Sequence, residues 1–174
     1  SFCGVVSNAG KARFKGLEFE SNARLGRDIF SGGDRLNLQT AIGFIDADYR
    51  EYIANIASVP TDVADYRRVQ NTPKWTASGT LSYNVPVGDG SLYFGSTVSW
   101  RSKTYQFEIP NPYIDQKGYA LWDASLVYTA PSDRWSIGVH GKNLLDKEYK
   151  TSGYTFVAAN PVTGAIINNA AGYP

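Results

Sequence analysis

Six segments of this sequence alternate between apolar and polar residues. They cover residues 13–25, 36–49, 74–85, 91–103, 118–130 and 135–145. A period of two places successive side chains on opposite faces, so each segment is predicted to form a β-strand. Each segment has 11–14 residues, whereas a strand of a globular protein typically has about 5–6. A tilted strand that crosses a membrane needs about 9–11 residues, so the lengths favour membrane-spanning strands.

The two faces of each predicted strand differ in kind. In the segment 74–85, Trp75 and Leu81 alternate with Thr80 and Ser82. The apolar face carries few charges, and the opposite face carries Ser, Thr, Asn, Gly and charged residues. A polar face of this composition is typical of a water-filled barrel interior.

The connections between these segments alternate between short and long. In an antiparallel up-and-down sheet every second connection lies at the same end, so the long loops are predicted at one end and the short turns at the other. The short connections are the tight turns 86–90 and 131–134 and a medium turn around 31–34, and the long ones are 51–73, 104–117 and 147–174. Outer-membrane barrels sort their loops in this way. The predicted fold is therefore all-β: an antiparallel up-and-down segment, with about six long strands, of a larger transmembrane β-barrel.

Aromatic residues lie near the ends of the predicted strands, where they are expected to form two rows at the two lipid–water interfaces. Trp75, Trp100 and Trp122 are predicted on the long-loop side, and Tyr83, Tyr128 and Trp135 on the short-turn side. The apolar face is accordingly expected to contact outer-membrane lipid.

Composition excludes some classes of function. The net charge of +1 gives no basic surface for nucleic acid. A single cysteine cannot form an internal disulfide. The chain starts with Ser and contains no Met, so we expect it to be a processed product or part of a longer protein.

The segment from Asn143 to Tyr149 resembles a short element of a known family. Asn143, Leu144, Asp146, Lys147 and Tyr149 match the "N-L-x-D-K-x-Y" pattern found near the end of TonB-dependent outer-membrane receptors. Residues 8–20, 71–83 and 119–128 also resemble strands of that family's C-terminal half, in the same order.

The resemblance implies a 22-stranded barrel filled by a plug domain, in the outer membrane of a Gram-negative bacterium. Residues 1–174 would then be an internal part of the C-terminal third of the barrel, without the plug and the final strand. The remaining part of the same barrel would complete the wall. The family implies active uptake of a scarce, bulky nutrient (a ferric siderophore, haem, cobalamin or an oligosaccharide) energised by the TonB complex, which contacts the plug.

Candidate ligand-binding residues lie in the predicted long loops and on the polar face. Aromatic side chains on exposed loops stiffened by proline are plausible ligand contacts, and a cationic side chain inside the barrel could meet an anionic cargo. The candidates are Tyr105, Phe107 and Tyr113 in the loop 104–117, Tyr154 and Phe156 in the segment 147–174, and Arg101.

Enzymatic chemistry is not expected. Glu18 and Glu20 share one predicted face, as do Asp46 and Asp48, and such pairs can do acid–base work, but here we expect solvated interior residues. His140 has no second histidine to complete a metal site. No catalytic residue, cofactor or metal is predicted. A passive porin and a soluble carbohydrate-binding β-sandwich remain alternatives, and the sandwich predicts a second protein layer over Trp75, Phe94 and Ile137.

Overall fold

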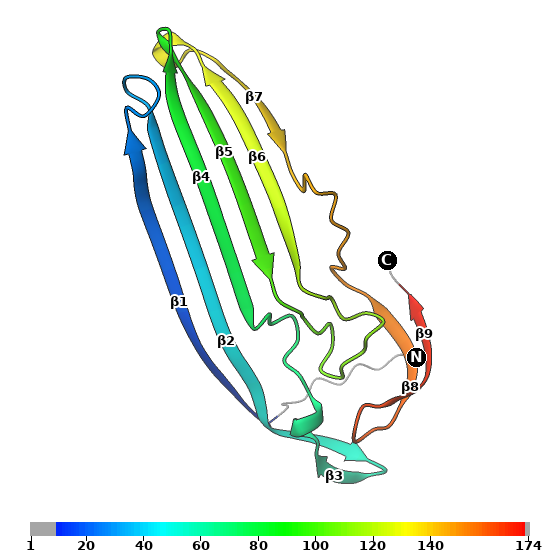
Figure 1. Ribbon diagram of the computed structural model, residues 1–174. Helices are drawn as coiled ribbons and strands as arrows, with labels where there is room; N and C mark the ends of the chain where they lie inside the picture. The colour runs from blue at the N-terminus through cyan, green and yellow to red at the C-terminus, as the bar shows by residue number, and fades with distance from the viewer. Residues whose placement is uncertain (1–9, 173–174) are drawn as a thin grey trace.

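The computed structural model describes residues 10–172 and contains one large antiparallel sheet (Figure 1). Its long strands follow one another in the order β1-β2-β4-β5-β6-β7, and the short strand β3 pairs with the end of β2. Strands β8 and β9 form a separate hairpin. The strands are β1 (Gly10–Arg27), β2 (Arg35–Ile56), β3 (Val59–Asp62), β4 (Trp75–Val87), β5 (Gly90–Arg101), β6 (Tyr119–Thr129), β7 (Ser136–Gly141), β8 (Tyr154–Ala159) and β9 (Ile166–Gly172); two 3-10 turns, η1 (Ala64–Tyr66) and η2 (Pro131–Asp133), lie in connections.

The connections are sorted as the sequence predicts. In Figure 1 the β1–β2, β4–β5 and β6–β7 turns lie at the top, and the β2–β4 and β5–β6 connections lie at the bottom. The tightest turn joins β4 to β5, because Val87 pairs directly with Gly90. Gly88 takes a φ of 60° there, a left-handed conformation that glycine adopts without strain. The all-β, up-and-down architecture is confirmed.

The largest differences from the predicted boundaries concern β2, β7 and the segment after β7. Strand β2 continues to Ile56 and forms a hairpin with β3 inside the expected loop 51–73. The hairpin turns at Ala57 and Ser58, whose positive φ values of 49° and 68° cannot be inferred from their residue types. Strand β7 ends at Gly141, short of the predicted residue 145, and the β8–β9 hairpin occupies part of the expected loop 147–174.

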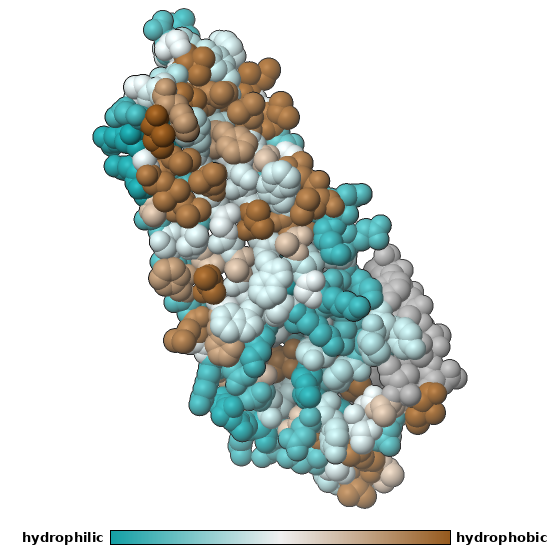
Figure 2. Space-filling model, in the orientation of Figure 1, coloured by the Kyte–Doolittle hydropathy of each residue, from teal (hydrophilic) through white to brown (hydrophobic). Residues whose placement is uncertain are grey.

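Strand register aligns the apolar residues into one continuous face. Phe44 pairs with Trp75, and Val98 pairs with Trp122. Figure 2 shows this face, with hydrophobic atoms gathered over the upper part of the sheet. Within residues 10–172 no second layer covers it, since Leu17 is 77% exposed and Val139 is 74% exposed. The second layer that a soluble sandwich requires is therefore missing from the described part of the chain.

The described sheet does not close on itself. Strands β1 and β7 stand at its two edges, and no pairing joins them among residues 10–172. An open edge exposes unpaired backbone groups, which lipid does not tolerate. The sheet therefore corresponds to a part of a barrel.

Among the described residues, no helix is long and apolar enough to cross a membrane.

Candidate functional site

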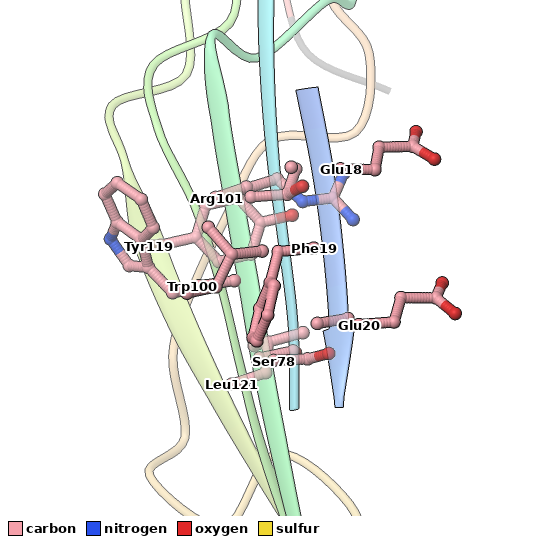
Figure 3. Close-up of a pocket in the computed structure, with 14 residues that line it drawn as sticks. Glu18, Phe19, Glu20, Ser78, Trp100, Arg101, Tyr119 and Leu121 are labelled. Atoms are coloured by element: carbon pink, nitrogen blue, oxygen red, sulfur yellow. The ribbon is translucent and has the colours of Figure 1, made fainter. Parts of the chain in front are cut away.

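A hollow of about 320 Å³ lies on the sheet near the long-loop end. Its lining comes from five neighbouring strands, β1, β2, β4, β5 and β6, because strand register brings residues of the same face side by side. Figure 3 shows the carboxylates of Glu18 and Glu20 and the guanidinium of Arg101 extending to one side of the sheet. The polar residues of the lining include Glu18, Glu20, Thr76, Ser78, Ser99, Arg101 and Tyr119.

Cross-strand pairing holds a cation against an aromatic ring at this hollow. Arg101 at the end of β5 pairs with Tyr119 at the start of β6. The Arg101 guanidinium carbon lies 5.6 Å from the centre of the Tyr119 ring, within the range of a cation–π contact. Tyr119 is only 8% exposed, so its ring is fixed in place.

The Tyr119 ring is covered by Tyr149, the last residue of the family element. The two rings are stacked, with centroids 4.7 Å apart and planes 12° apart. The element thus brings the chain after β7 back against the polar face, beside the hollow.

Asn143 stabilises the turn that brings the chain back against the polar face. Its backbone N–H donates to an Asp123 carboxylate oxygen at 2.7 Å. Its side-chain oxygen accepts from the backbone N–H of Lys147 at 2.9 Å, and its side-chain amide donates to the Lys147 carbonyl at 3.2 Å. Asn143 has a φ of 50°, which Asn adopts more readily than most residues. The element Asn143–Tyr149 is therefore a structural turn, and the structure does not place it as a ligand site.

The loop between β5 and β6 is stabilised by contacts among its own residues. Thr104 and Gln116 exchange backbone hydrogen bonds of 3.0 and 3.1 Å at its base. Ile114 is 1% exposed, and the Asp115 side chain is 3% exposed. The Asp115 carboxylate lies 3.4 Å from the Lys103 ammonium. The loop also holds the chain after β7, because Gln116 accepts from the backbone N–H of Lys150 at 2.7 Å.

Of the six predicted ligand-binding residues, the four whose side chains the structure describes do not form one site. Arg101 lines the hollow. Tyr105 lies under the Lys103 ammonium, 4.3 Å from its ring centre, and lines another hollow beside Trp75. Phe107 and Tyr113 are exposed on the loop. The side chains of Tyr154 and Phe156, in β8, lie outside the described residues.

Sequence reasoning missed Tyr119 as part of the lining of the hollow. The signal was present, because Tyr119 is in phase with Leu121 and Asp123 in the alternating segment. Its importance depends on Arg101 and Tyr149, however, and their approach to its ring is a tertiary feature.

The expectation that Asp46 and Asp48 face the barrel interior is wrong. Register pairs Leu17 with Phe44, then Lys15 with Asp46 and Arg13 with Asp48. No bulge intervenes between these pairs, so both carboxylates lie on the same face as Leu17. They lie on the apolar side of the sheet, beyond its last apolar pair, Leu17 and Phe44.

The predicted aromatic rows lie at the two ends of the sheet. Trp75 begins β4, Trp100 is the penultimate residue of β5, and Trp122 lies in the first half of β6, all toward the long loops. At the short-turn end, the rings of Tyr128 and Trp135 lie 5.7 Å apart.

Tyr83 at the short-turn end is tied to a buried carboxylate in the β1–β2 turn. The Tyr83 hydroxyl donates to Asp34 at 2.7 Å. The backbone N–H groups of Ile29, Phe30 and Ser31 also donate to this carboxylate, at 2.7, 2.8 and 3.0 Å. Burial favours the neutral carboxyl, but the hydrogen bonds outweigh it and lower the pKa of Asp34 to about 2.

No group of three or more His, Cys, Asp or Glu side chains suited to a metal ion occurs in the described part of the chain.

A family model described as "TonB dependent receptor-like, beta-barrel" matches residues 2–144. The chain belongs to this family. Its members are receptors and transporters of the Gram-negative outer membrane, and the family is not one of enzymes. The match ends within the Asn143–Tyr149 element. No solved structure matches the chain.

Proposed function

We propose that this chain forms part of the wall of an outer-membrane import receptor that takes up a scarce, bulky nutrient with energy from the TonB complex. The observation that carries the proposal is the division of one sheet into two faces. The apolar face is continuous and uncovered in the described structure, and the polar face carries a hollow at the long-loop end. The family match supports a gated receptor over a passive porin.

The chain's own residues would bind and orient the cargo. Arg101 presents a fixed cation, Glu18 and Glu20 present carboxylates, and Ser78 and Ser99 present hydroxyls to the same hollow. Energy coupling would reside in the plug, which contacts TonB. The cargo class is a ferric siderophore, haem, cobalamin or an oligosaccharide.

Uptake by the complete protein, in cells that lack the native gene, tests this proposal. Each cargo class is supplied in labelled form at limiting concentration, with and without an uncoupler of the proton gradient. We expect one class to accumulate inside the cell only with the gradient intact, while binding at the cell surface survives the uncoupler. Uptake that is insensitive to the uncoupler would instead establish the porin.

A pair of variants locates binding. Arg101→Ala should weaken surface binding of that cargo, because it removes the cation beside the hollow. Arg24→Ala removes a cation from the same face of β1 outside this hollow and should leave binding unchanged. Equal effects of the two variants would exclude the hollow as the binding site.

A further inference from the structure

The apolar face ends abruptly in a band of charged residues on its long-loop side. Leu17 and Phe44 form its last apolar pair on β1 and β2, and the next pairs on this face are Lys15–Asp46 and Arg13–Asp48. Figure 2 shows the same change, from hydrophobic atoms above to hydrophilic atoms below. If the apolar face meets hydrocarbon, as the proposed function requires, this band lies at the depth of the lipid head groups.

A second hollow, of about 440 Å³, opens in this band beside Trp75. Three cations line it: Arg68 from the β2–β4 connection, Lys74 before β4, and Lys103 after β5. Trp75 and Tyr105 contribute aromatic rings to its lining. The hollow therefore combines basic groups with amphipathic rings at the edge of the apolar face.

The carboxylates of the hollow are already engaged by another cation. The Arg13 guanidinium lies 2.7 Å from Asp48 and 3.9 Å from Asp46. Lys74 shares Asp46 at 3.3 Å, and its ammonium lies 5.6 Å from the centre of the Phe44 ring. The Lys74 side chain is nevertheless 60% exposed.

Arg68 contributes a charge without a counter-ion. Its Nη1 donates to the backbone carbonyls of Asp65 and Arg67 at 3.0 and 2.7 Å. Among residues 10–172 no carboxylate forms an ion pair with it. These two bonds hold the guanidinium in place and leave its charge available to an anion. Guanidinium and ammonium groups together suit a phosphate, whose oxygens accept charge-assisted hydrogen bonds.

We propose that the hollow beside Trp75 binds the phosphorylated head group of a lipid in the leaflet on the long-loop side. Arg68 and Lys74 contact the phosphate, and the acyl chains run along the apolar face above. This inference rests on the membrane placement in the proposed function. It concerns a lipid site on the apolar side of the wall, whereas the cargo is proposed to bind on the polar side.

Native mass spectrometry of the complete protein in neutral detergent tests the proposal, with phosphatidylglycerol titrated as the probe. The test variant is Arg68→Gln with Lys74→Gln. Lys103 stays in place, because its loss would leave the buried Asp115 carboxylate unpaired. The matched control is Arg24→Gln with Arg35→Gln, which removes two cations from the opposite face.

We expect the test variant to bind phosphatidylglycerol roughly 25-fold more weakly, since it removes two basic residues and each one near a membrane surface contributes about fivefold to the attraction. The control variant should bind as the unmodified protein does. A neutral glycolipid of the same chain length should bind more weakly than phosphatidylglycerol to the unmodified protein, and this difference should disappear in the test variant.

Equal affinity of the test variant and the unmodified protein for phosphatidylglycerol would overturn the proposal. A change in oligomeric state with unchanged lipid affinity would also overturn it, and would assign the hollow to contact with a second copy. Because the measurement uses purified protein without cargo, its failure is separate from a failure of the uptake experiment.

Discussion

The ring of Tyr149 stacks on the ring of Tyr119, with centroids 4.7 Å apart and planes 12° apart. This contact joins the end of the family element to the first residue of β6. Because Arg101 lies against the same Tyr119 ring, the stack also helps to shape one side of the polar hollow. The element thereby supports the candidate site without itself lining it.

Replacement of Tyr149 by alanine should destabilise the complete barrel. A stacked aromatic pair contributes about 1 kcal/mol beyond the area it buries, so Tyr149→Ala should lower the free energy of unfolding by at least that much. Tyr149→Phe keeps the ring and should retain most of the stability. Denaturant unfolding followed by tryptophan fluorescence measures both variants, and equal losses for the two would show that the ring stack is not the stabilising contact.

Lysine scanning of β4 should distinguish its two faces. Leu81, near the middle of the strand, lies on the apolar face, and its neighbour Ser82 lies on the polar face. A lysine on the lipid face near the bilayer centre costs about 2–4 kcal/mol, so Leu81→Lys should impair assembly in the outer membrane. Ser82→Lys should assemble normally, because its side chain faces water. Membrane fractionation with protease protection reports assembly, and a defect confined to Ser82→Lys would reverse the assignment of the faces.

The β1–β2 turn should weaken in acid. Asp34 has a pKa of about 2 in the folded protein, below its ordinary value of 3.8. A depressed pKa stabilises the folded state above the ordinary value, and this stabilisation is lost as pH falls through the folded value. The barrel should therefore lose stability between about pH 4 and pH 2, and Asp34→Asn should show a smaller loss over the same window.

The exposed Asp89, in the β4–β5 turn, provides the control for this measurement. Asp89→Asn should retain the acid sensitivity of the unmodified protein, because no hydrogen bond to the Asp89 side chain occurs in the described structure. Denaturant unfolding at a series of pH values gives the comparison. If Asp34→Asn and the unmodified protein lose stability in parallel, the Asp34 carboxylate does not control the acid response.

Much of the fold could be predicted because its determinants are local. The alternation of Trp75, Leu81 and their neighbours defines two faces within a single strand, and the tight turn at Gly88 follows from residue type. The prediction missed the β2–β3 hairpin, since neither Ala57 nor Ser58 is a residue type that favours the left-handed conformation at its turn.

The strands, their two chemically distinct faces and the sorting of the loops could all be inferred from the amino-acid sequence, because each depends on residues close together in the chain. The contacts between distant residues became known only from the three-dimensional fold. Strand register places Asp46 on the same face as Phe44, beyond the last apolar pair. Folding of the chain after β7 brings the ring of Tyr149 onto that of Tyr119. Such contacts depend on the pairing of distant strands, which a period of two along one strand does not specify.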